Sequence, residues 1–197
     1  YGILNGTCNY ILTDMAGSGR EFDDILAEAQ ELGYAEADPS FDVDGIDAAH
    51  KLAILASVAF GTELDFDNVY VEGIRHVSPL DIELAQELGY RIKLLGIARR
   101  TEHGVEQRVH PCMVAEASAI AQVGGVFNAV VAEGNFVDRV VFEGRGAGEG
   151  PTASAVIGDV VDVARGIRLP AFSVAAKDLN AIDPAPMDRH TGPYYVR

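Results

Sequence analysis

The chain has 197 residues, of which 48% are hydrophobic, and it carries 30 acidic against 15 basic side chains. This length suffices for a sizeable core, and roughly 150 residues per domain predicts one domain with an appendage. The net charge of -15, spread along the sequence, disfavours nucleic acid and anionic membranes as partners. No apolar run approaches the roughly 20 residues that span a bilayer, and the start resembles no secretory leader. We expect a cytoplasmic protein.

Both ends of the sequence predict cuts inside a longer polypeptide. The first residue is Tyr1, not Met, and an apolar segment begins at once. The last residues, 194–197, have the pattern of an opening strand. We therefore expect further chain on both sides.

The N-terminal part of the sequence predicts amphipathic helices. Apolar residues recur with helical spacing over 9–16 and 22–32, and Gly33 is the expected C-cap of the second helix. A loop dense in carboxylates follows at 34–47, and the strong helix formers of 48–60 keep the helical period. The acidic loop should therefore deliver its residues to the beginning of a helix.

The remaining elements are mostly strands. Period and composition predict a strand at 69–74, a helix at 79–88 and a strand at 90–100. Further strands are expected at 106–109, 125–133 and 137–142, the last two forming an antiparallel hairpin around Gly134-Asn135. A glycine-rich loop at 144–152 opens onto a helix that runs to about Ala164, and nothing regular is expected after Gly166.

These elements predict an α+β fold. We expect a mixed, largely antiparallel sheet that is covered by helices on one face. The other face or an edge of the sheet should then be available to a second copy of the chain, as in a homodimer or higher homo-oligomer.

Asp47 and Lys51 form the strongest candidate pair, because they lie four residues apart on one face of a predicted helix. The same stripe continues to Leu55 and Val58, which we expect to face the core. Spacing alone favours an exposed ion pair worth about 0.3–0.5 kcal/mol. An ion pair on a core-facing stripe favours a functional site instead.

The residues upstream of Lys51 favour the functional interpretation. Five carboxylates crowd the preceding loop: Glu36, Asp38, Asp42, Asp44 and Asp47. Such crowding is repulsive unless a cation, a substrate amine or backbone donors compensate for it, which suits a ligand with an ammonium group. A lysine in such a pocket can exchange a proton near neutral pH. The competing interpretation, a divalent-metal site, lacks the spacing of a calcium loop.

Other candidate features carry weaker signals. Cys8 and Cys112 lie far apart without CxxC or Cys/His ligand spacing, so we expect two buried, reduced thiols. Thr7 is expected to cap the first helix, whose free amides can also hold a carboxylate. The glycines of 144–150 can approach a phosphate or cofactor, although they match neither a Walker sequence nor a dinucleotide fingerprint.

Two motifs resemble those of homoserine dehydrogenases: the run Asn5-Gly6-Thr7-Cys8-Asn9-Tyr10-Ile11-Leu12 and the spacing of glycines, acids and lysine from Ala29 to Lys51. Further similarities lie in 93–98, 125–130 and 144–156, so that the resemblance covers residues 2–165. It implies an oxidoreductase that interconverts L-homoserine and L-aspartate 4-semialdehyde with NAD(H) or NADP(H). The implied pathway leads to threonine, methionine and isoleucine.

The resemblance also implies roles for individual residues. Lys51 takes the position of the acid/base lysine, and Asp47 that of the carboxylate that fixes the substrate hydroxyl and orients the lysine. The implied substrate contacts are Thr7, Tyr34, Glu36 and Asp42, with Glu36 receiving the substrate ammonium group. The implied neighbours of the cofactor are Gly6, Gly146, Ala147 and Gly148. No metal ligand is implied.

By the same resemblance, residues 1–145 form a substrate-binding, catalytic and dimerisation domain, and residues 146–197 return toward a nucleotide-binding domain. The sequence contains no match to that nucleotide-binding domain, to its second catalytic lysine or to most ligands of its monovalent cation. We therefore expect this segment alone to have little or no dehydrogenase activity.

Two alternatives compete with the enzyme fragment. One is a non-catalytic amino-acid-binding or dimerisation module that keeps the pocket. The other is a different nucleotide-dependent semialdehyde or sugar dehydrogenase of the same architecture. An acylating dehydrogenase requires a nucleophilic cysteine beside a histidine, and Cys8 is the one candidate for it.

Overall fold

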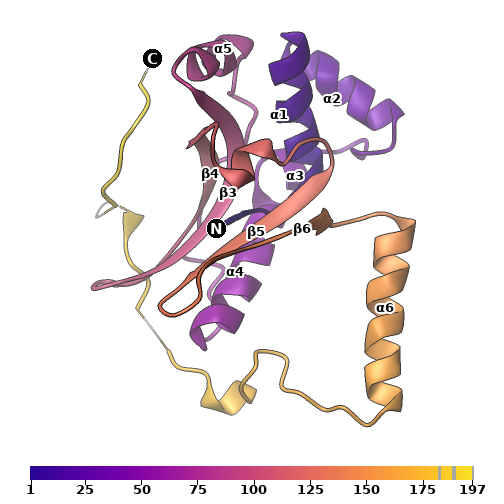
Figure 1. The fold of residues 1–197 in the computed structure, drawn as a ribbon, viewed down its shortest axis with the longest axis vertical. Helices are drawn as coiled ribbons and strands as arrows, with labels where there is room; N and C mark the ends of the chain where they lie inside the picture. Colours follow the sequence, from indigo (N-terminus) through magenta and orange to yellow (C-terminus); the bar gives the residue numbers. More distant parts are fainter. Residues whose placement is uncertain (182, 188–189, 197) are drawn as a thin grey trace.

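The computed structural model describes residues 1–197 except 182, 188–189 and 197 (Figure 1). Its centre is a six-stranded sheet in the order β2-β4-β3-β1-β5-β6. The strands are β1 (Gly2–Ile3), β2 (Tyr70–Val71), β3 (Tyr90–Thr101), β4 (Gly104–Ala115), β5 (Phe127–Gly134) and β6 (Asp138–Arg145). All neighbours pair antiparallel except β2 and β4, which pair parallel. The predicted mixed, largely antiparallel sheet of an α+β fold is therefore confirmed.

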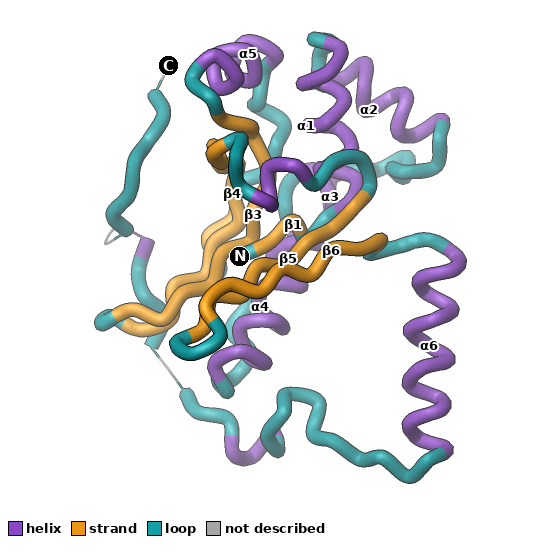
Figure 2. The backbone as a smooth tube through the Cα atoms, viewed as in Figure 1, coloured by secondary structure: helices purple, strands orange, loops and turns teal. Residues whose placement is uncertain are grey.

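Helices pack against one face of this sheet, as predicted (Figure 2). They are α1 (Gly6–Ser18), α2 (Phe22–Glu31), α3 (Ser40–Val43), α4 (Ile46–Phe60) and α5 (Pro79–Glu87). A longer helix, α6 (Glu149–Ala164), stands apart from the sheet and has no buried residue (Figure 1). Two short 3-10 turns complete the fold, η1 (Ala119–Gln122) and η2 (Ala176–Asp178).

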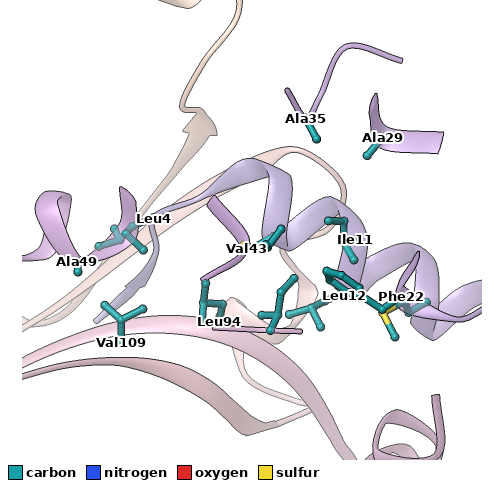
Figure 3. Close-up of a cluster of buried hydrophobic side chains, with 14 of the residues drawn as sticks. Leu4, Ile11, Leu12, Phe22, Ala29, Ala35, Val43, Ala49, Leu94 and Val109 are labelled. Atoms are coloured by element: carbon teal, nitrogen blue, oxygen red, sulfur yellow. The ribbon is translucent and has the colours of Figure 1, made fainter. Parts of the chain in front are cut away.

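The main core lies between the helices and the sheet. It joins residues of α1 such as Ile11 and Leu12 to Leu94 of β3 and Val109 of β4 (Figure 3). Side chains alternate between the faces of a strand, so Leu95 points the other way, into a second cluster with Ile3, η1 and β5. Burial of each such side chain stabilises the fold by about 1.5–3 kcal/mol. The centre of the sheet is therefore covered on both faces.

Helix α4 lies on the sheet through a face of small residues. The buried positions are Ala48, Ala49, Leu52, Ala53, Ala56 and Ser57. Leu55 and Val58 are instead 37% and 39% exposed. The prediction that the stripe of Asp47 and Lys51 faces the core is therefore wrong. Alanines allow a closer approach to β3 and β4 than the larger side chains would, so the alanine face is the one that is buried.

Several elements differ from the predictions in extent. Strand β4 runs through Pro111, which pairs with Leu94, although proline within an apolar run argues against a central strand. Strand β1 has only two residues, too few for a periodic signal. The hairpin is confirmed, with Gly134 opposite Asp138 at its closed end. No helix in the described part of the chain is long and apolar enough to cross a membrane.

The C-terminal segment is more ordered than predicted in one place and less in another. Besides η2, it forms isolated bridges from Asn180 to Thr62 and from Pro184 to Val105. Residues 194–196 form no strand, so the predicted opening strand is wrong for these residues, and Arg197 lies outside the described ones. The tail is held against the end of α4 and the beginning of β4.

Lys93 is a buried cation of β3. It is 4% exposed, and its Nζ donates to Asn9 Oδ1 at 3.0 Å and to the Val123 carbonyl at 2.6 Å. Burial, and secondarily repulsion from Arg91, lowers the pKa of Lys93 to about 8. The lysine ties α1 to β3 through hydrogen bonds to neutral groups.

We predict that Lys93 makes the stability of the fold rise with pH. The unfolded chain holds the lysine proton up to the ordinary pKa of 10.5, whereas the folded chain releases it near 8. Between these values the unfolded state binds more protons, so stability increases with pH by on the order of 3 kcal/mol. Melting curves measured from pH 7 to 10 should show a rise in the Tm of the wild type that is absent from Lys93→Met. The control variant Lys177→Met, at an exposed lysine, should show the same rise as the wild type. If Lys93→Met also follows the wild type, the prediction is refuted.

Candidate functional site

The candidate site forms where β1 passes into α1. Asn5 is the N-cap of α1, with extended backbone, and its side-chain Oδ1 accepts the Cys8 amide at 2.8 Å. The prediction that Thr7 caps this helix is therefore wrong. Asn is among the best N-caps because its oxygen satisfies a free amide of the first turn. Asn5 thereby anchors the beginning of the helix in a buried position.

The other half of the Asn5 carboxamide meets the acidic loop. Its Nδ2 donates to Asp42 Oδ1 at 2.7 Å and to Asp47 Oδ2 at 2.8 Å. Asp42 belongs to α3 and Asp47 to the first turn of α4. One amide therefore joins α3 and the first turn of α4 to the beginning of α1.

Lys51 completes this cluster. Its Nζ lies 2.7 Å from Asp47 Oδ2 and 3.2 Å from the Leu4 carbonyl. The side chains of Lys51 and Asp47 are 48% and 19% exposed. Because the pair is at the surface, it adds little to stability. An ammonium group has three N–H donors, so one remains for a ligand.

Two of the remaining acids of the loop, Asp38 and Asp44, have other partners. Arg75 pairs with the Asp44 carboxylate and donates to Ser40 Oγ at 3.0 Å. Asp38 accepts the Ser40 amide, and hydrogen bonding from Ser40 lowers the pKa of Asp38. The crowding is thus relieved by protein donors. Within the described residues, no three His, Cys, Asp or Glu side chains gather as metal ligands would.

Thr7 and Tyr34 contact each other beside the beginning of α1. Thr7 Oγ1 donates to the Tyr34 carbonyl at 2.7 Å, and the Tyr34 ring packs against Tyr10 with 5.0 Å between centroids. Glu36 is exposed, and the described residues offer its carboxylate no hydrogen bond or ion pair. The structure therefore joins Thr7 to Tyr34 and leaves the Glu36 carboxylate open to solvent.

Two of the predicted cofactor glycines, Gly6 and Gly146, lie beside Asn128. Asn128 Nδ2 donates at 3.2 Å to the Leu4 carbonyl, which Lys51 also contacts. A Cβ on Gly6 would lie 2.8 Å from the Val126 carbonyl, and one on Gly146 would overlap the Asn128 amide. Ala147 and Gly148 are exposed, and Gly148 has a φ of 109°. At Gly6 and Gly146 the lack of a side chain therefore allows close packing against Val126 and Asn128.

Sequence reasoning missed the roles of Leu4, Asn5 and Asn128. Asn5 and Asn128 both lie in segments that carried the resemblance, but an asparagine in such a segment does not reveal which partners it has. The sequence cannot indicate that Lys51 and Asn128 both donate to the Leu4 carbonyl, because every residue has a backbone carbonyl. The usable signal was Asn5 itself, a strong N-cap directly before a helix.

The site is an open surface. Cavities of about 200 and 190 Å³ lie elsewhere, one beside Tyr70 and Pro184 and the other beside Phe22 and Arg75. Neither contains Lys51. A ligand held at Lys51 by these residues alone would stay largely open to solvent, whereas small-molecule sites usually bury most of their ligand.

The cysteines are free, as predicted. Burial, then the charges of Asp42 and Asp47, raises the pKa of Cys8 far above its usual value. Cys112 has a histidine neighbour that the sequence did not predict, with 3.4 Å between its Sγ and His110 Nδ1. Burial nevertheless raises the pKa of Cys112 to about 12. Neither thiol is suited to act as the nucleophile of an acylating dehydrogenase.

Comparison with known proteins identifies the family of the chain. A family model described as homoserine dehydrogenase matches residues 1–161. The chain belongs to the homoserine dehydrogenase family. It is 51% identical over its whole length to a homoserine dehydrogenase of Pseudomonas aeruginosa, of which it covers 46%. A homoserine dehydrogenase of Synechocystis is 52% identical over 82% of the chain, which covers 38% of that relative.

Solved structures of the family have the same fold. The crystal structure of a homoserine dehydrogenase from Thiobacillus denitrificans matches 94% of the chain with a TM-score of 0.89 and 52% identity. A hyperthermophilic archaeal homoserine dehydrogenase mutant, in complex with NADPH, matches 85% with a TM-score of 0.69 and 30% identity. The chain covers 44% and 47% of these two proteins. It therefore spans less than half the length of the homoserine dehydrogenases that it resembles here.

We predict that Gly146→Ala loosens the contact between Asn128 and Leu4. The new Cβ would displace the Asn128 amide, and a buried hydrogen bond left unmade costs about 1–3 kcal/mol. Gly144→Ala is the matched control, since a Cβ there meets no atom within 4 Å, and it should shift the free energy of unfolding by less than about 0.5 kcal/mol. Denaturant titrations of both variants measure the difference. Equal stability of the two would contradict the contact.

Proposed function

We propose that this chain is the substrate-binding, catalytic portion of a homoserine dehydrogenase, which interconverts L-homoserine and L-aspartate 4-semialdehyde with NAD(H) or NADP(H). The observation that carries the proposal is the contact of 2.7 Å between Lys51 and Asp47, in a chain of this family. The pathway would be the biosynthesis of threonine, methionine and isoleucine. Two free cysteines support a reducing, cytoplasmic location.

The charges of the site complement an amino acid. In the proposal, the exposed Glu36 carboxylate and Asp42 receive the substrate ammonium group. Thr7, at the beginning of α1, and Tyr34 contact the substrate from the other side. The first-turn amides of a helix favour an anion such as the substrate carboxylate. The substrate hydroxyl then faces Asp47 and Lys51.

Lys51 is the proposed proton shuttle. In homoserine oxidation its neutral Nζ accepts the hydroxyl proton, and in the reverse direction the ammonium form returns a proton to the carbonyl oxygen. Asp47 holds Nζ in position through its Oδ2. In the ammonium form, Asp47 and Leu4 accept two of the three N–H hydrogens. In the proposal, the third hydrogen is directed at the substrate oxygen.

The bare backbone around Asn128 suits a nicotinamide dinucleotide. Gly6, Gly146, Ala147 and Gly148 would contact it, since their main chain can approach a large ligand closely. When bound, the dinucleotide supplies the hydride acceptor. The archaeal relative in complex with NADPH supports NADP(H) as one of the cofactors to test.

In the proposal, the exposed apolar surfaces of the chain are its contacts with the rest of the enzyme. In α6 the residues Val156, Ile157 and Val160 are more than half exposed on one stripe, and we assign this stripe to contact with a nucleotide-binding domain. This assignment makes residues 1–145 the catalytic and dimerisation domain and 146–197 the return toward that domain. In β6, Phe142 is 63% exposed. In the proposal it contacts a second subunit in a homodimer.

We predict that Lys51→Ala abolishes turnover but keeps homoserine binding. Loss of a general acid/base lowers the rate by about 10²–10⁴-fold, whereas the substrate contacts remain. The measurement is NAD(P)H absorbance during homoserine oxidation by the full-length protein, with homoserine affinity determined in parallel. Lys177→Ala serves as the control, because Lys177 is exposed on η2. Unchanged turnover would refute the site, and a wild-type protein that binds but never oxidises homoserine would favour the non-catalytic module.

We predict that Glu36→Gln raises KM for homoserine with a smaller effect on kcat. The variant removes an attraction to the ammonium group that exists before and during the reaction, and such uniform binding affects KM. A charged contact of this kind is worth about 1.5–3 kcal/mol, or roughly 10- to 100-fold. Glu83→Gln, at an exposed glutamate of α5, should leave both constants unchanged. A fall in kcat at constant KM would assign Glu36 to the chemical step instead.

A further inference from the structure

We propose that Asn5 is a positioning residue of the catalytic site, whose carboxamide clamps Asp42 and Asp47 together and thereby sets the place of Lys51. The inference rests on the proposed function, because it concerns the same proton transfer. It assigns a role in catalysis to a residue that otherwise serves as a helix cap.

The Asn5 side chain is fixed before it meets the carboxylates. It is 4% exposed, and its Oδ1 is held by the Cys8 amide at 2.8 Å. Because a carboxamide is planar, holding the oxygen orients the nitrogen. The two hydrogens of Nδ2 then go to two different acceptors, Asp42 Oδ1 at 2.7 Å and Asp47 Oδ2 at 2.8 Å. Every hydrogen-bonding group at the end of this side chain therefore has a defined partner.

A neutral donor is needed at this position. Two carboxylate oxygens within 2.8 Å of one nitrogen bring two negative charges close together, which is unfavourable without compensation. Hydrogen bonds from an amide to charged acceptors are stronger than those between neutral groups. Aspartate at position 5 would keep the cap oxygen but add a third negative charge. Serine would keep a cap oxygen but has no second donor arm.

The clamp reaches Lys51 by two routes. The same Asp47 Oδ2 accepts from Asn5 at 2.8 Å and from Lys51 at 2.7 Å. The residue before the cap, Leu4, offers its carbonyl to Lys51 Nζ at 3.2 Å, and Asn128 holds that carbonyl from the other side. The short segment of Leu4 and Asn5 therefore fixes both the carboxylate and the carbonyl that position the lysine.

The test compares Asn5→Ser with Asn5→Asp in the full-length protein. Serine is about as good an N-cap as asparagine, so Asn5→Ser removes the donor while keeping the cap. We expect kcat/KM for homoserine to fall on the order of 10- to 100-fold, with little change in Tm. The fall should lie in kcat more than in KM for homoserine, because the proton transfer loses its geometry while the proposed contacts of Glu36 and the helix amides to the substrate remain. Asn5→Asp should lose more activity. Asn135→Ser, at an exposed turn residue, is the matched control.

A double variant separates positioning from folding. If Asn5 acts through Asp47 and Lys51, Asn5→Ser should cost little further activity in the Lys51→Ala background. An equal loss in both backgrounds together with a lowered Tm would overturn the proposal, and so would Asn5→Ser with wild-type kcat and kcat/KM. In the latter case an inactive Lys51→Ala leaves the proposed function standing. A wild-type protein that does not oxidise homoserine would overturn both.

Discussion

The hydrogen bonds of Asn5 are the interaction on which the geometry of the candidate site depends. They meet where the central strand β1 ends and α1 begins, so the sheet, the first helix and the acidic loop converge on one carboxamide. The cap alone is worth about 1 kcal/mol. Its larger effect is geometric, because Asp47 is held from the core side while Lys51 remains half exposed. A rigid interior thereby presents a proton-exchanging group at the surface.

Periodicity predicted most of the elements that surround this point, and the physical reason for each miss is local. Strand β1 is two residues long and carries no period, while Pro111 hid the length of β4. The outward direction of Leu55 and Val58 was missed because α4 has apolar residues on two sides. Tertiary packing determines which of the two apolar sides is buried, and in α4 it is the side with the alanines. Which partners a capping asparagine finds is likewise a matter of tertiary structure, as Asn5 demonstrates with a carboxylate 42 residues away.

Two features of the molecule are typical of surfaces that another part of a protein covers. The Lys51 cluster lies on an open surface, and α6 exposes an apolar stripe with no buried residue. Both features are those of surfaces that become covered, since exposed apolar patches of this kind mark interfaces. Water excluded by such a cover would strengthen each charge interaction of the site. The proposed nucleotide-binding domain would thus both cover the apolar stripe of α6 and exclude water from the surroundings of Lys51.

Because the buried face of α4 is rich in alanine, methyl groups determine how far the candidate site lies above the sheet. Ala49, Leu52 and Ala53 are the spacers between the helix and β3 and β4, and Lys51 projects from the opposite side. A larger side chain at Ala53 would have to lift the helix, because protein interiors are close-packed. The thickness of one apolar layer therefore determines how far the Lys51 nitrogen stands from the sheet. In this fold, the volume of the core side chains sets the position of the candidate site.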